Sequence, residues 1–140
     1  MMKLPDKPSE LIRLALKDLA EGLKEKQFDV DMDFWVARDP GLPRCTVCLA
    51  GAVMVRELGF STLHDATPSL VGGDTEAKLD ALNYLRQGNV EDALIMLDQC
   101  EEIWPPGLET DREICPYADD PQEFFKDMRA LADHLEEHKL

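Results

Sequence analysis

The sequence is short of basic residues and has no long apolar run. Its 140 residues carry 29 acidic side chains against 15 basic ones, a formal net charge of −14. This shortage of Lys and Arg argues against direct binding to nucleic acid or to an anionic membrane, because both draw their affinity from basic side chains. The longest apolar block, residues 47–55, is half the roughly 18 residues that a membrane span needs. We therefore expect no transmembrane helix.

Cysteine and histidine are also sparse. Four cysteines are too few for a disulfide scaffold, and residues 1–8 lack the apolar stretch of a secretory signal. These two absences predict free thiols in a reducing cytoplasm. The length fits one compact domain over residues 1–140, and an apolar content of 44% is too high for a disordered acidic chain.

What the sequence does have is an uneven distribution of acid. Residues 89–140 contain 15 acidic and 4 basic side chains, a net charge of −11, whereas residues 1–88 are nearly balanced at −3. We therefore expect an acidic C-terminal third, 89–140. Whatever docks on it is expected to be a basic protein surface.

Apolar residues at three- and four-residue spacing predict helices along most of the chain. The expected helices are 9–26, 48–58, 74–87, 90–100 and a final one that begins at Asp120. Ser9 is the expected N-cap of the first helix, and Asp74 or Thr75 that of the third. Gly88 closes the third helix, so that the third and fourth form an antiparallel hairpin.

A strict alternation of apolar and polar residues over 28–36 is the clearest strand signal. A turn-rich link over 38–43 follows it, so we expect a hairpin between 28–37 and about 43–48. The predicted fold is α+β and mainly helical, with four or five helices and one short β-hairpin. The alternative is an all-α bundle with an extended segment at 28–36. Gly51, between Ala50 and Ala52, is expected to let another backbone approach closely in the core.

Cys45 and Cys48 form a Cys-x-x-Cys motif, which supplies two of the four ligands of a zinc site. His134 and His138, one helical turn apart, would complete that set. Some 85 residues separate the two pairs, far more than in a compact zinc finger. We therefore expect core thiols and no cofactor, with zinc as the alternative and a redox thiol as a weaker one. Other residues that could complete a zinc site are His64, Cys100 and Cys115.

Asp29, Asp31 and Asp33 lie two residues apart, so a strand would place them on one face with Trp35. The favoured interpretation is the solvated face of an edge strand. The alternatives are a hard cation such as Mg²⁺ or Ca²⁺, catalytic carboxylates, or a partner-binding surface with Trp35 as a contact.

The sequences DMDFW at 31–35 and CTVCLAGAVM at 45–54 resemble small uncharacterised proteins of tailed bacteriophages and prophages. The resemblance continues in ALNYLRQG at 81–88 and in short matches between 111 and 132, so it covers most of the chain. It implies a phage or prophage origin and a bacterial cytoplasm as the working compartment. Because that group has no assigned activity, no functional residue can be transferred from it.

No nucleophile elbow or phosphate loop occurs in the sequence. We therefore expect a non-enzymatic acidic accessory protein that binds a host or phage protein, as an inhibitor or, in a sharper version, as a nucleic-acid mimic. The alternative is a metal-dependent enzyme or zinc-stabilised domain that uses the three aspartates or the cysteines with histidines. The candidate partner-binding residues are Trp35, Asp127, Asp133, Glu136 and Glu137.

Overall fold

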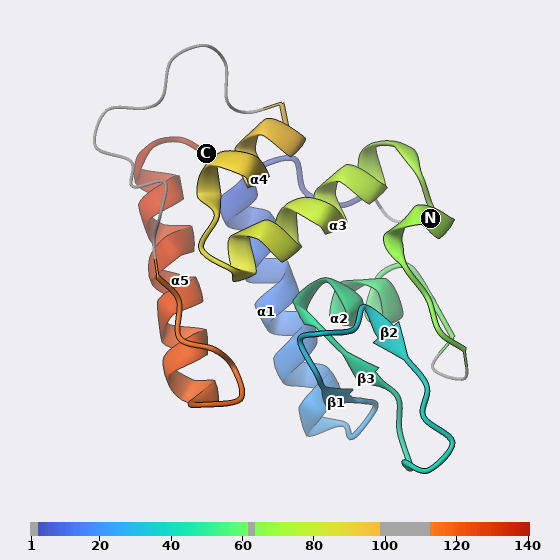
Figure 1. Cartoon of the computed structure of the whole chain (residues 1–140). Helices are drawn as coiled ribbons and strands as arrows, with labels where there is room; N and C mark the ends of the chain where they lie inside the picture. Colours follow the sequence, from blue (N-terminus) through green and yellow to red (C-terminus); the bar gives the residue numbers. More distant parts are fainter. Residues whose placement is uncertain (1–2, 62–63, 99–112) are drawn as a thin grey trace.

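The computed structural model describes residues 3–61, 64–98 and 113–140 (Figure 1). In chain order the elements are α1 (Pro8–Lys24), β1 (Asp29–Val30), β2 (Val36–Ala37), β3 (Thr46–Val47), α2 (Leu49–Arg56), the 3-10 helix η1 (Pro68–Leu70), α3 (Gly73–Arg86), α4 (Val90–Met96) and α5 (Pro121–Glu137). The predicted mainly helical α+β fold is confirmed. The presence of a sheet rules out the all-α alternative.

Helix α1 lies at the centre of the molecule, between α5 and α2 (Figure 1). Most of its apolar stripe is buried, as the sequence periodicity predicts: Leu11, Ile12 and Leu19 are fully buried, whereas Leu23 is half-buried. The expected N-cap is wrong by two residues. Lys7 takes that position, and the Ser9 hydroxyl instead donates to the backbone carbonyl of Leu140 at 2.6 Å.

The three short strands form one sheet in the order β1-β3-β2. β2 pairs with β3 in antiparallel fashion, which confirms the inner part of the expected hairpin, whereas β1 pairs with β3 in parallel. The continuous strand predicted over 28–36 is wrong, because a turn separates β1 from β2. The side-chain carboxylate of Asp31 accepts the backbone N–H of Asp33 at 3.0 Å. The backbone carbonyl of Asp31 accepts the backbone N–H of Phe34 at 3.2 Å.

Helices α3 and α4 form the expected antiparallel hairpin (Figure 1). α3 begins at Gly73, so neither Asp74 nor Thr75 is its N-cap; Gly72 holds that position with a φ of 65°. Gly88 lies between the helices at a φ of 80°, in the left-handed region that glycine adopts without strain. α4 ends at Met96, short of the expected 100, and residues 99–100 lie outside the described part of the chain.

Helix α5 starts as the sequence predicts. One carboxylate oxygen of Asp120 accepts the N–H groups of Gln122 and Glu123, each at 3.1 Å, so it satisfies two of the free donors at the helix start. The inner face of α5 packs on α1 through Phe124, Met128 and further apolar residues. Within the described residues, no helix has the length and apolarity to cross a membrane.

Candidate binding site

Cys45 and Cys48 are core residues, with exposed fractions of 1% and 3%. Cys48 caps α2, and its sulfur accepts the N–H of Gly51 at 3.4 Å. Burial raises the pKa of both thiols above the ordinary cysteine value, which suppresses the reactive thiolate. The expectation of core thiols is confirmed, and the redox interpretation of the motif loses its physical basis.

His134 lies on α5 and His138 is the residue that caps its C-terminal end, with ring centroids 4.9 Å from each other. Among the described residues, no three His, Cys, Asp or Glu side chains gather as a group that could hold a metal ion. The structure therefore does not bring Cys45, Cys48, His134 and His138 together. His64 is exposed and Cys115 is half-buried, whereas Cys100 lies outside the described residues.

Three of the four candidate acids on α5 take part in the fold itself. Asp127 accepts the backbone N–H of Cys115 at 3.0 Å. Asp133 and Glu136 both pair with Arg13 of α1, the former at 2.7 Å. Glu137 is exposed. These acids of α5 thus connect α5 to α1 and to the segment that precedes α5.

Asp29, Asp31 and Asp33 do not share one strand face. Asp29 forms an ion pair with Arg44 at 3.0 Å, and Asp31 closes the turn after β1. Asp33 is exposed and lies in that turn. Trp35 is half-buried against the core and still lines a cavity beside β2, together with its neighbour Phe34, which is 51% exposed.

Phe34 and Leu42 line one cavity of about 420 Å³ beside β2, and Leu42 is 41% exposed. Four aspartates also line it: Asp31, Asp33, Asp39 and Asp65. Arg38 is the cation there, and its guanidinium donates to the carbonyls of Asp39 and Leu42 at 2.8 and 2.6 Å. These two hydrogen bonds hold the link between β2 and β3 in place. We define Phe34, Leu42, Asp39 and Asp65 as the docking surface.

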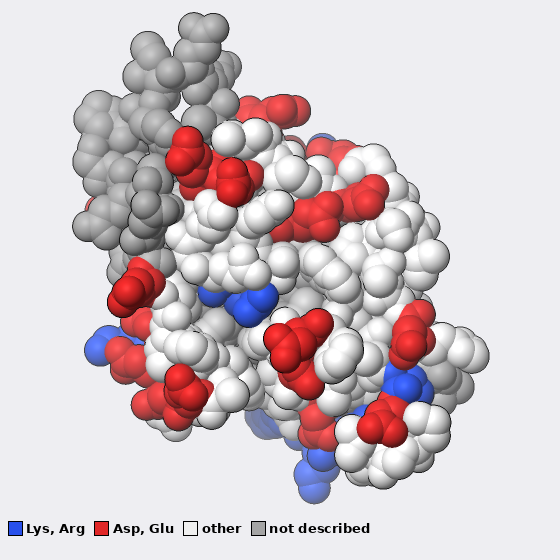
Figure 2. All heavy atoms as spheres, viewed as in Figure 1, with Lys and Arg blue, Asp and Glu red and all other residues white. Residues whose placement is uncertain are grey.

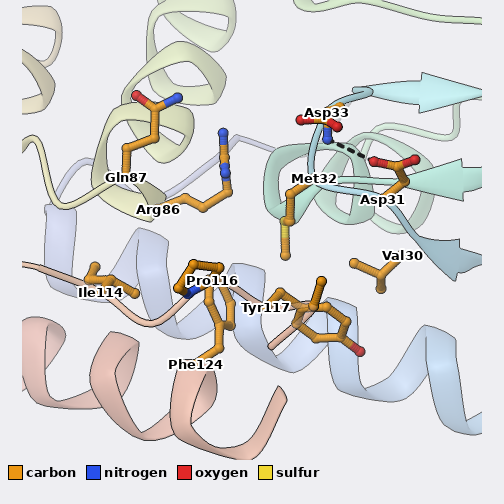
Figure 3. Close-up of a pocket in the computed structure, with 11 residues that line it drawn as sticks. Val30, Asp31, Met32, Asp33, Arg86, Gln87, Ile114, Pro116, Tyr117 and Phe124 are labelled. Carbon is orange, nitrogen blue, oxygen red and sulfur yellow. Dashed lines mark hydrogen bonds between the residues drawn. The ribbon is translucent and has the colours of Figure 1, made fainter. Parts of the chain in front are cut away.

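A second cavity, of about 610 Å³, lies between the turn after β1, the C-terminal end of α3, and the segment that leads into α5 (Figure 3). Its apolar lining consists of Val30, Met32, Ile114, Pro116, Ala118, Tyr117 and Phe124. Its polar lining consists of Asp31, Asp33, Arg86 and Gln87. Arg86 and Asp33 also line an adjoining cavity of about 260 Å³. We call the larger hollow the Arg86 cavity.

Sequence reasoning missed Arg86 as a site residue. A signal was nevertheless present, because the positions three and four residues away hold Leu82, Asn83, Asn89 and Val90, none of them acidic. An arginine without an acidic neighbour at these positions forms no ion pair within its own helix.

No protein-family model matches this chain, and the searches of curated proteins and of solved structures also find no match.

Proposed function

We propose that the protein is a non-enzymatic, acidic binding factor whose docking surface holds a basic segment of another protein. The observation that carries this proposal is the pairing of two exposed apolar side chains, Phe34 and Leu42, with aspartates in one cavity. Scattered exposed apolar residues are ordinary, but two that line one hollow offer an anchor point. The surrounding carboxylates give the hollow a negative sign.

The chemistry of the partner follows from this arrangement. An apolar side chain inserted between Phe34 and Leu42 would be removed from water, while neighbouring Lys or Arg side chains would face Asp39 and Asp65. Central apolar anchors supply most of the affinity in such contacts, and the charged rim supplies orientation and rate of association. The net charge of −14 favours approach of a basic partner from any direction.

The bacteriophage resemblance suggests the setting: a bacterial cytoplasm, with a host or phage protein as the partner. If the basic surface of that partner ordinarily faces nucleic acid, the protein acts as an inhibitor that mimics it. The proposed contact with the partner is the docking surface and not the acids of α5. Asp133 and Glu136 are already paired with Arg13, so a partner would have to displace an existing ion pair.

The test is affinity capture from bacterial lysate with four immobilised proteins: the wild type, Phe34→Ser, Leu42→Ser and Ile95→Ser. Ile95 is a matched control, because it is 53% exposed on α4, away from the docking surface. A specific protein should be retained by the wild type and by the Ile95 variant, and at least tenfold less by the other two. Its retention should fall as salt rises from about 50 to about 500 mM. Equal retention by all four proteins, or no specific retention, would refute the proposal.

A further inference from the structure

Arg86 has unused hydrogen-bonding capacity in the Arg86 cavity. Its Nε and Nη2 atoms both donate to the side-chain oxygen of Asn83, at 3.3 and 3.1 Å. A guanidinium carries five N–H groups, so these two bonds leave three donors without a partner among the described residues. Three free donors on a planar fork match the two oxygens of a carboxylate.

Asp33 offers the opposite charge on the other side of the hollow. Figure 3 shows Arg86 extending from the end of α3 and Asp33 on the turn across from it, with Met32 between them. Neither Asp31 nor Asp33 forms an ion pair with Arg86 in the described part of the chain. Asp31 already accepts the N–H of Asp33, whereas no bond to the carboxylate of Asp33 occurs among the described residues. The Arg86 cavity thus lies between a guanidinium and a carboxylate that form no ion pair with each other.

Between and below these charges the wall is apolar. Met32 projects into the hollow, and the ring of Tyr117 lies on its floor (Figure 3). Phe124 packs edge-on against Tyr117, with ring centroids 5.6 Å apart, so the aromatic floor is supported from α5. At about 610 Å³ the hollow falls within the ordinary range for small-molecule sites, roughly 300–1,000 Å³.

The charge of the whole protein restricts what can enter. Figure 2 shows basic surface in a hollow near the middle of this face, with acidic side chains around it. A free anion would be repelled by the net charge of −14 before it reached Arg86. A free cation would be repelled by the positive charge of Arg86 itself. A zwitterion carries no net charge and can satisfy both groups at once.

We propose that the Arg86 cavity binds a free α-amino acid with an apolar side chain. Its carboxylate is held by Arg86, its ammonium group by Asp33, and its side chain lies against Met32 and Tyr117. This goes beyond the proposed docking function, because it assigns a small-molecule ligand to a different hollow. The bound amino acid would connect the turn after β1 to the end of α3 and the segment before α5.

The probe is L-phenylalanine, titrated into the full chain by calorimetry and by ligand-observed NMR. A ligand of this size with two charge contacts should bind with a dissociation constant of about 1 mM or below. L-Phenylalanine amide lacks the carboxylate, N-acetyl-L-phenylalanine lacks the ammonium charge, and glycine lacks the apolar side chain. Each should bind at least tenfold more weakly. Equal binding of any of the three, or no binding of L-phenylalanine, would overturn the proposal.

Two substitutions test the two charge contacts separately. Arg86→Gln should weaken L-phenylalanine binding at least tenfold and leave the weak binding of the amide unchanged. Asp33→Asn should weaken L-phenylalanine binding and remove the preference over the N-acetyl derivative. Arg86→Lys keeps the charge but loses the fork, so it should fall between the wild type and Arg86→Gln. Thermal unfolding of each variant would show that it is folded.

Matched controls separate this site from general charge effects. Lys126→Gln and Asp39→Asn make the same charge changes outside the Arg86 cavity and should leave L-phenylalanine binding unchanged. Leu42→Ser damages the docking surface without touching the Arg86 cavity, so it too should bind L-phenylalanine normally. If these controls weaken binding as much as Arg86→Gln and Asp33→Asn do, the assignment of the two contacts is refuted.

Discussion

The backbone carbonyl oxygen of Trp35 occupies the space that a β-carbon on Gly51 would need. An ideal Cβ built on Gly51 would lie 1.6 Å from that oxygen. The same oxygen accepts the N–H of Cys48 at 3.4 Å, so the start of α2 packs directly against Trp35, the residue that precedes β2. Phe34 precedes Trp35, and this contact therefore fixes the segment that separates the docking surface from the Arg86 cavity.

Gly51→Ala should cost about 3 kcal/mol or more of unfolding free energy, because the atom in the way is backbone and cannot rotate aside. Equilibrium unfolding in urea measures this. Gly41→Ala is the matched control, since its added Cβ would meet the flexible end of Asp39 at 3.3 Å, and it should cost less than about 0.5 kcal/mol. A Gly51→Ala protein within about 1 kcal/mol of the wild type would contradict the close contact.

Gly22 of α1 stands in a similar relation to Phe28, but here the obstacle is a side chain. An added Cβ would lie 2.1 Å from the tip of the fully buried Phe28 ring. Gly22→Ala should therefore cost about 2–3 kcal/mol, and the double variant with Phe28→Leu should cost less than the sum of the two single changes. A double-mutant cycle in urea measures the coupling. Simple additivity would show that the ring has room to move.

The helices were predictable because their apolar stripes are local and strong. α1 lies within two residues of the expected range at each end, and α5 begins at the expected cap, Asp120, since each helix buries one clear face. The 28–36 segment misled sequence reasoning for a physical reason. Aspartates at alternate positions fit a solvated strand face, but Asp31 uses its carboxylate to close a turn onto Asp33. The parallel pairing of β1 with β3 involves two residues from each strand, too few to leave a sequence pattern.

The candidate site was predicted less well than the fold. Sequence reasoning selected Trp35 as the aromatic contact; Trp35 does line the cavity of the docking surface, but the more exposed ring there is that of its neighbour Phe34. It selected acids on α5, of which Asp133 and Glu136 pair with Arg13. Such ion pairs depend on how α5 lies against α1, and the sequence of either helix alone does not contain that information. The importance of Arg86 likewise depends on which residues face it across a cavity.

Arg56 joins α2 to α1. Its guanidinium contacts Glu21, Glu25 and Gln27, each at 2.9 Å, and its side chain is only 18% exposed. Arg56→Ala should cost about 2 kcal/mol, and Arg56→Lys roughly half of that, because an ammonium group cannot make the same forked contacts. Arg13→Ala is the control. Its side chain is 41% exposed, so its ion pairs should contribute less than about 1 kcal/mol. Urea unfolding should rank the three variants in this order, and a larger loss for Arg13→Ala would contradict it.

Asp18 makes stability depend on pH in an unusual direction. Burial is the largest cause that raises the pKa of Asp18 to about 7, and the neighbouring carboxyl group of Glu57 adds to it, although the positive charges of Arg56 and Lys17 act to lower it. The folded state therefore holds a proton that the unfolded state loses near pH 3.8. The cost of ionising the buried carboxyl is absent below pH 3.8, grows as pH rises and is complete above about pH 7.

Asp18→Asn removes this ionisation while keeping the shape of the side chain. Its melting temperature should match that of the wild type near pH 4, and should exceed it at pH 8 by about 4 °C or more. The difference between the two proteins is the quantity to measure, because the net charge of −14 shifts both curves alike. Asp119→Asn, at an exposed position, should follow the wild type at every pH. A constant difference between Asp18→Asn and the wild type from pH 4 to pH 8 would show that Asp18 stays ionised in the folded protein.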